Sequence, residues 1–269
     1  MIAIVAAVLA GGNRSAKSAS AIVADAPGRT TGSGTVHSSM TETLSVDGQT
    51  RPVIDLEADA DQSQHRSIGH ILTPQGTVAV TMRTIGSDTY IQSPRVTLPR
   101  GAHWLVISED DTTARRQFGS NDPSTGLRFL SGLHGDPRRV GTEVVNGADA
   151  THYALTLDMN AVLDEAAQQT SRLGVDGLTE SLAQVRNVVD MSNIPGDVWI
   201  DSAGRVRRFR FTIHADADGS SVTAVATIDF SKFGEPLTVD QPSSDDTLPF
   251  RDDPTFFQDF AANTATPSA

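Results

Sequence analysis

The stretch that decides the fold is IPGDVWIDSAGRVRRFRFTI, residues 194–213. Its first half alternates, so that Val198 and Ile200 share one side of a strand, because strand side chains point to opposite faces with period two. Ser-Ala-Gly at residues 202–204 supplies a three-residue hairpin connection, in which the glycine provides the positive φ. The return strand places an apolar set on one face: Phe209, Phe211 and Ile213. The hairpin therefore predicts a piece of antiparallel sheet with an apolar inner face and a solvent-exposed outer face.

Val206 is out of phase with that apolar set, which predicts a bulge near Arg207 that twists and curves the sheet. The same alternation recurs along the chain and predicts further strands at residues 34–47, 53–60, 66–72, 77–84, 89–92, 103–108, 138–145, 151–158 and 222–230. Consecutive short strands separated by turns favour an antiparallel meander. No internal repeat occurs, and no linker interrupts residues 34–240, so we expect a single domain of the α+β class.

Helical patterns interrupt the strands at three places. Residues 16–26 fit a short helix that ends at Pro27, and a leucine stripe with helical spacing follows Pro123, at Leu127, Leu130 and Leu133. Residues 160–190 predict two amphipathic helices, which would cover the apolar face of the sheet. Residues alone leave open whether the space between sheet and helices is filled by side chains or by a ligand.

Composition narrows the function classes. The 269 residues carry a net charge of −12, which opposes binding to the phosphate backbone of nucleic acids. There is no cysteine, so disulfides and thiolate metal sites are excluded. No GxSxG, HExxH, GxGxxG or P-loop motif occurs. We therefore expect a protein that is not an enzyme, with no catalytic residues, no metal and no cofactor.

One dense basic run stands out, at Arg205, Arg207, Arg208 and Arg210. Such a run either contacts acidic lipid headgroups or forms a solvent-facing strand surface that discourages edge pairing. The sequence favours the solvent-facing interpretation and leaves the other open.

The first residues predict export. Residues 2–10, IAIVAAVLA, form nine consecutive apolar residues, which is too short for a membrane span of about 20 residues and fits the core of a signal peptide. A buried amino-terminal strand or helix is the alternative. We divide the chain into a signal-like segment (1–12), a small and polar linker or short helix (13–33), the domain (34–242) and an acidic, partly disordered tail (243–269).

Several motifs resemble one family. VNGADATHY (145–153), IPGDVWIDSAGRVRR (194–208) and DFSKFGEPLTVDQP (229–242), with MRTIGSDTYIQSP (82–94) and HWLVI (103–107), resemble actinobacterial envelope lipoproteins of the LppX/LprG type. The resemblance covers residues 34–242. It implies a LolA-like fold, in which a strongly curved antiparallel half-barrel covers helices and encloses an apolar cavity for acyl chains.

The resemblance also implies a function and a location. Such proteins are exported to the cell envelope and tethered through the cysteine of a Leu-Ala-Gly-Cys box; here Gly12 replaces that cysteine, so the lipid anchor is not expected. We expect a non-enzymatic lipid-binding or lipid-transfer protein at the outer face of the cytoplasmic membrane. Its partners would be acyl chains of lipids or glycolipids and a membrane surface, and it would be a monomer. The alternative is an envelope sensor or protein-interaction module with a filled core.

The residues expected to line the cavity are apolar and come from the strands and helices that would face each other. They are Leu155, Leu157, Val162, Leu178, Leu182, Val185, Val189, Phe209, Phe211 and Ile228.

Overall fold

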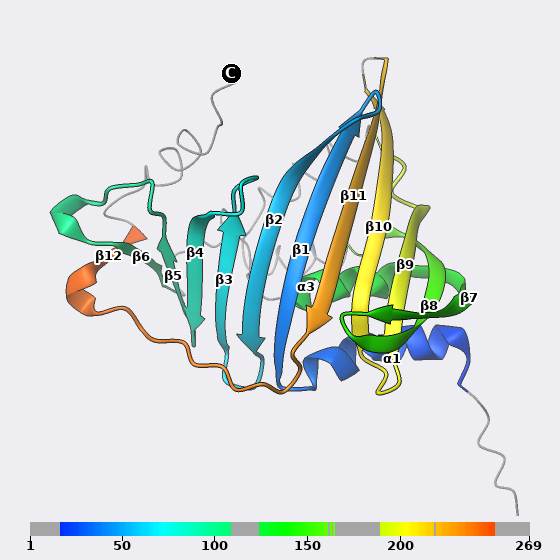
Figure 1. The fold of residues 1–269 in the computed structure, drawn as a ribbon, viewed down its shortest axis with the longest axis horizontal. Helices are drawn as coiled ribbons and strands as arrows, with labels where there is room; N and C mark the ends of the chain where they lie inside the picture. The colour runs from blue at the N-terminus through cyan, green and yellow to red at the C-terminus, as the bar shows by residue number, and fades with distance from the viewer. Residues whose placement is uncertain are drawn as a thin grey trace, which may run out of the picture.

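The protein folds around one large sheet in a computed structural model that describes residues 17–108, 124–160, 162, 164, 189–217 and 219–250 (Figure 1). The strands are β1 (Thr35–Val46), β2 (Gln49–Asp61), β3 (Arg66–Leu72), β4 (Val78–Ile85), β5 (Asp88–Gln92), β6 (Trp104–Ile107), β7 (Leu133–Val145), β8 (Ala148–Leu157), β9 (Ile194–Asp201), β10 (Val206–Ala217), β11 (Ser220–Ser231) and β12 (Thr247–Pro249). The helices are α1 (Ala19–Thr31) and α3 (Ser124–Arg128), with 3-10 turns η1 (Pro99–Gly101), η2 (Phe129–Gly132) and η3 (Ser244–Asp246).

The sheet consists of two meanders joined edge to edge. Strands β1 to β6 pair in sequence, strands β7 to β11 do the same, and β1 pairs with β11, where Met40 lies opposite Ile228. These pairings are antiparallel, as the alternation predicted. The α+β class is confirmed, and the open sheet is compatible with the predicted half-barrel.

The sheet extends beyond the domain boundary predicted at residue 242. Strand β12 pairs with β6 in parallel orientation, with Leu248 opposite Leu105, so the sheet is mixed and not purely antiparallel. In Figure 1 the chain leaves β11, runs along the lower edge of the sheet and returns to it at β12. Leu248 and Phe250 are buried, which explains why this short segment docks.

The opening hairpin has the predicted bulge. The register of β9 and β10 shifts between Val206 and Arg208, which leaves Arg207 as the extra residue. Gly204 adopts φ +81°, and the carboxylate of Asp201 accepts hydrogen bonds from the backbone N–H groups of Ala203 (3.0 Å) and Arg205 (2.9 Å). The turn is therefore held by its own backbone and side chains.

Helix α1 continues past Pro27, so the prediction that it ends there is wrong. Ser18 caps its start, accepting from the N–H of Ala21 at 3.2 Å. Its last turn is tied to the sheet: the hydroxyl of Thr30 donates to Ala26 O (2.8 Å) and accepts from the N–H of Val206 (2.8 Å). This buried tertiary contact stabilises helical residues after the proline, where the lost N–H bond would otherwise end the helix.

Two apolar clusters form the core of the described residues. One joins α1, α3 and η2 to the inner face of β8 to β11, and it includes Phe209 and Phe230. The other joins β4 to β6 with Leu248 and Phe250. The predicted helices over 160–190 lie mostly outside the described residues, as do the apolar segment 2–10 and the chain beyond 250. Among the helices described, none has the length and apolarity needed to cross a bilayer.

Candidate functional site

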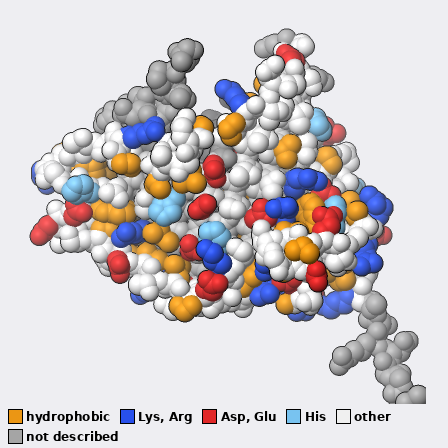
Figure 2. Space-filling view, in the orientation of Figure 1, with side chains coloured by type: hydrophobic (Ala, Val, Ile, Leu, Met, Phe, Trp, Pro, Cys, Tyr) orange, Lys and Arg blue, Asp and Glu red, His pale blue; other side chains and the backbone are white. Residues whose placement is uncertain are grey.

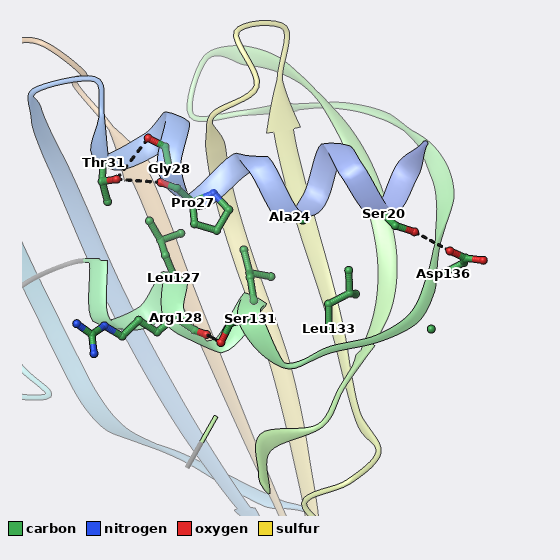
Figure 3. A pocket seen from close by; sticks show the side chains of 12 residues that line it. Ser20, Ala24, Pro27, Gly28, Thr31, Leu127, Arg128, Ser131, Leu133 and Asp136 are labelled. Carbon is green, nitrogen blue, oxygen red and sulfur yellow. Dashed lines mark hydrogen bonds between the residues drawn. The ribbon is translucent and has the colours of Figure 1, made fainter. Parts of the chain in front are cut away.

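A cleft of about 880 Å³ opens between helix α1 and the chain that runs from α3 through η2 into β7 (Figure 3). The α1 wall is formed by Ser20, Ala24, Pro27, Gly28 and Thr31. The opposite wall is formed by Leu127, Arg128, Leu130, Ser131, Leu133, Gly135 and Asp136. Apolar atoms make up most of its surface.

The sequence of α1 explains why the cleft is open. Its cleft residues stand at positions i, i+4, i+7, i+8 and i+11 from Ser20, which places them on one face of a helix, and all of them are small. The opposite face carries the residues that the sheet buries: Val23, Ala26 and Thr30. A helix face without long side chains leaves the space in front of the facing leucines unfilled.

The opposite wall is fixed by close packing. A Cβ on Gly126 would lie 2.4 Å from Cδ1 of Ile228, and one on Gly132 would lie 2.5 Å from the carbonyl oxygen of Asp158. These glycines let α3 and η2 approach the sheet closely. Leu127 and Leu130 are buried as a result, and Leu133 remains half-buried beside the cleft.

The two ends of the cleft differ in charge. At the amino-terminal end of α1, the hydroxyl of Ser20 donates to the carboxylate of Asp136 at 2.6 Å. At the other end Arg128 is exposed on the wall below Thr31 (Figure 3). The cleft therefore combines apolar walls with an acidic end and a basic end.

The predicted lining residues that the structure describes lie next to this cleft and do not form its walls. The structure gathers seven of them into one buried cluster that also contains Leu127 and Leu130: Leu155, Leu157, Val162, Val189, Phe209, Phe211 and Ile228. Phe129 of η2 meets Phe211 edge to face, with ring centroids 5.4 Å apart. The other three, Leu178, Leu182 and Val185, lie outside the described residues. That the ten residues line a ligand cavity stays a prediction.

Sequence reasoning missed the α1 wall. The leucine stripe at residues 127–133 was visible, and so was a short helix before residue 33. The further signal was the helical spacing of small residues from Ser20 to Thr31. Nothing local indicates that two segments about a hundred residues apart would face each other.

The basic run pairs with carboxylates of its own sheet. The guanidinium of Arg208 donates two hydrogen bonds to the carboxylate of Asp229 (2.8 and 3.1 Å), and Arg210 donates to Asp197 at 2.7 Å. Arg205 likewise lies 2.9 Å from a carboxylate oxygen of Asp201. Figure 2 shows basic and acidic side chains intermingled on this part of the outer face. This arrangement supports the solvent-facing interpretation for these three arginines, because their charges are already matched. For Arg207 that interpretation is wrong, since its side chain is buried and donates to the carbonyl of Asn146 at 2.9 Å.

A histidine joins three strands on the same face. His152 of β8 lies between Glu143 of β7 (2.9 Å) and Asp197 of β9 (2.7 Å), and its ring stacks on Trp199 with centroids 4.3 Å apart. Burial raises the pKa of Asp197, but hydrogen bonds from Arg210 and His152 outweigh it and hold that pKa below its ordinary value. Among the described side chains, no three His, Asp or Glu residues are arranged to hold a metal ion.

Comparisons with known proteins extend this description. No family model matches the chain. A curated relative, an uncharacterized 31.2 kDa protein encoded between rplA and rplJ in Streptomyces griseus, is 24% identical over 161 residues, which is 56% of this chain and 50% of the relative. The chain thus spans about half the length of that relative.

The chain is also similar to solved structures. The lipoprotein LppX of Mycobacterium tuberculosis is 19% identical, with 82% of this chain and 98% of that chain covered and a TM-score of 0.45. LprF of Mycobacterium bovis is 16% identical, with 84% and 97% covered and a TM-score of 0.45. A LolA-superfamily protein of Nitrosomonas europaea is 12% identical, with 83% and 96% covered and a TM-score of 0.29. No family, activity or ligand follows from similarities of this size.

Proposed function

We propose that this protein is an exported, non-enzymatic lipid-binding or lipid-transfer protein of the cell envelope. The observation that carries the proposal is the apolar cleft of about 880 Å³ between α1 and the η2 segment. Small-molecule sites typically measure about 300 to 1,000 Å³ and are lined mainly by apolar groups. Each buried methylene contributes about 0.8 kcal/mol, so an acyl chain of about 15 methylenes gains up to roughly 12 kcal/mol without specific polar contacts.

The cleft and the predicted cavity residues are parts of one site in this proposal. Leu127 and Leu130 belong both to the cleft wall and to the buried cluster around Phe209 and Phe211. An acyl chain that enters beside Leu133 would reach that cluster by displacing the side chains between them. The apolar segment 2–10 supports export, the acyl chains of lipids or glycolipids are the proposed ligands, and the proposed state is a monomer that meets a membrane surface.

The first test asks whether the cleft holds lipid. Protein purified without denaturation is analysed by native mass spectrometry and then titrated with a fluorescent fatty acid. Ala24→Phe places a ring on the exposed cleft face of α1, and Gln64→Phe adds the same ring in the exposed turn after β2. We expect uptake by the native protein and by Gln64→Phe, and at least tenfold weaker uptake by Ala24→Phe. Protein that is free of lipid and takes up no probe would contradict the proposal.

A second function has one observation in its favour. Leu157 and Phe209, both predicted to line a cavity, have no exposed surface, so this part of the core is filled by protein. A filled core suits an envelope sensor or a protein-interaction module. The same experiment distinguishes the two functions. An interaction module takes up no fatty acid, so Ala24→Phe changes nothing in the titration.

A further inference from the structure

A second pocket lies on another face of helix α1. Its volume is about 320 Å³, and its walls come from α1, from β8 and β9, and from the turn between β9 and β10. Ile22, Asp25 and Arg29 stand at positions i, i+3 and i+7, so they share one face of the helix. The two pockets have no lining residue in common. Helix α1 therefore borders two separate sites, the cleft and this second pocket.

The inner face of the sheet forms the floor of the second pocket. Thr151 and Tyr153 are two positions apart on β8, so both point to the same face, and Ile200 of β9 lies opposite Thr151. The side chain of Tyr153 is 6% exposed, and no described residue hydrogen-bonds to its hydroxyl. The described side-chain atoms that are sealed from solvent without a partner are Nε of Arg83 and Nε of Arg207. The hydroxyl of Tyr153 therefore opens into the pocket, with a proton to donate and lone pairs to accept.

The hydroxyl groups of the two sites differ in this respect. In the second pocket, Thr151 and Ser202 also carry hydroxyls that have no partner within the part of the chain that the structure describes. In the cleft, by contrast, the hydroxyls of Ser20, Ser131 and Thr31 each donate to an oxygen of the protein. The second pocket thus keeps donors available for a ligand.

The charges around the second pocket leave one cation without a bonded partner. Lys17 forms an ion pair with Asp25, and its hydrogen bond and charge hold the pKa of that carboxyl below its ordinary value, with a smaller contribution from the charge of Arg29. The carboxylate of Asp201 accepts from the backbone N–H (2.9 Å) and from Nε (3.0 Å) of Arg205. Arg29 is exposed and donates no hydrogen bond to any described residue.

The position of Arg29 depends on Gly204. A Cβ on Gly204 would lie 2.5 Å from Cδ of Arg29, so the stem of the arginine lies against the turn because that position is glycine. Both residues line the second pocket. The guanidinium is therefore held beside the unpartnered hydroxyls, and its planar fork of donors matches the oxygens of an oxyanion.

We propose that the second pocket binds the phosphoryl group of a small phosphorylated molecule, with the guanidinium of Arg29 and the hydroxyl of Tyr153 as its principal donors. A phosphoryl group offers three strong acceptor oxygens, whereas a carboxylate offers two. The volume of about 320 Å³ lies near the lower end of the range for small-molecule sites and leaves room for an organic group beyond the phosphate. This inference goes beyond the proposed function, because the pocket is separate from the cleft that would hold an acyl chain.

The test uses the full chain and isothermal titration calorimetry. The ligands are glycerol 3-phosphate, glycerol, inorganic phosphate and dihexanoyl phosphatidic acid below its micelle concentration. We expect glycerol 3-phosphate to bind, inorganic phosphate to bind more weakly and glycerol not to bind, and high salt should weaken the binding. Tighter binding of the phosphatidic acid, if it depends on Arg29, identifies a lipid headgroup as the source of the phosphoryl group. Tighter binding of glycerol 3-phosphate identifies a free phosphorylated molecule, and both results support the site.

Two variants and one control locate the binding. Arg29→Gln should weaken the binding of glycerol 3-phosphate about fivefold, the upper size of an exposed ion pair. Tyr153→Phe should weaken it about threefold, the size of one neutral hydrogen bond, and should leave the urea midpoint unchanged because the hydroxyl has no partner among the described residues. Arg138→Gln removes a positive charge from an exposed position of β7 outside the pocket and should bind as the native protein does.

Three results would overturn the inference. They are no binding of any phosphorylated ligand, native binding by both Arg29→Gln and Tyr153→Phe, and inorganic phosphate that binds as tightly as glycerol 3-phosphate. The proposed function is tested independently, because Ala24→Phe should leave the binding of glycerol 3-phosphate unchanged and Arg29→Gln should leave the uptake of fatty acid unchanged.

Discussion

The outer faces of the two meanders are stabilised by different kinds of contact. Over β8 to β11, charged side chains of neighbouring strands pair with each other, as Arg208 does with Asp229. Over β4 to β6, the contacts come from a segment of the chain that crosses the outer face. We define this return segment as residues 232–246. There the guanidinium of Arg83 donates to Asp240 O at 2.8 Å and lies 4.6 Å above the ring of Trp104. Gln241 donates to the hydroxyl of Tyr90 at 2.9 Å.

This difference shows what each meander depends on. The pairs over β8 to β11 join residues of adjacent hairpin strands, so they form as soon as the strands pair. The return segment joins residues about 150 positions apart, and the inner cluster of the same meander also needs Leu248 and Phe250. The meander of β1 to β6 is therefore complete only when the chain after β11 has returned to it, whereas α1 and α3 cover the other meander.

The largest expected effect on stability comes from truncating one fully buried side chain in each of the two apolar clusters. Phe209 and Leu105 have no exposed surface, so Phe209→Ala should cost about 3 to 5 kcal/mol and Leu105→Ala about 2 to 5 kcal/mol. The two tryptophans are buried on different meanders, Trp104 on β6 and Trp199 on β9. Urea unfolding followed in Trp104→Phe and Trp199→Phe backgrounds reports each meander separately.

If the β1–β11 pairing makes the sheet one cooperative unit, each alanine variant shifts both fluorescence transitions equally. If the meanders are independent, Leu105→Ala shifts the Trp104 transition alone. The second outcome would contradict the expectation that the chain forms a single domain. Gln64→Ala, in an exposed turn, controls for effects unrelated to packing.

The elements that sequence could predict are those that depend on local pattern. Alternation predicts β1, β3 and β11 almost to the residue. Val206 predicts the bulge at Arg207, because strand side chains alternate between two faces and an apolar residue out of phase indicates an inserted residue. Strand β12 was missed because a strand of three residues has too little alternation to read. Its parallel partner β6 lies about 140 residues earlier.

The candidate site was less predictable than the fold. Phe209, Phe211 and Ile228 were correctly placed on the inner face, since their period of two fixes their side of the sheet. The cleft depends on what faces that cluster, and the small residues of α1 give no hydrophobic signal. The last turn of α1, after Pro27, was not predicted for a similar reason. The rule that proline ends a helix is local, and it cannot include the distant contact between Thr30 and Val206.

That contact gives the next prediction. Thr30→Val keeps the shape of the side chain but removes the oxygen that accepts from the buried N–H of Val206. An unsatisfied buried donor costs about 1 to 3 kcal/mol, and the loss should appear in the Trp199 transition. Thr31→Val removes a hydroxyl bonded only within the helix and should cost less. Equal losses in the two variants would contradict the role given to Thr30 as the tie between α1 and the sheet.

A smaller effect is expected for the return segment. Arg83→Met keeps much of the apolar stem and removes both the bond to Asp240 and the charge above Trp104, at a cost of about 1 kcal/mol. Hydrogen exchange should accelerate in residues 236–246, and α1 should exchange as before. Arg66→Met, at an exposed position of β3, is the matched control. Exchange that accelerates equally in α1 would show that this contact does not act on the return segment specifically.

The smallest effect belongs to the charge network over β8 to β10. Because the pKa of Asp197 is lowered in the folded protein, its contribution to stability is present above the unfolded value of about 3.9 and is lost as pH falls through the lower folded value. Asp197→Asn should cost less than about 1 kcal/mol near neutral pH, as expected for a partly exposed pair. This difference from the native protein should shrink as pH falls below about 4, measured by urea unfolding. Asp149→Asn removes an exposed charge from β8 as a control. A difference that stays constant with pH would show that the charge of Asp197 contributes nothing to stability.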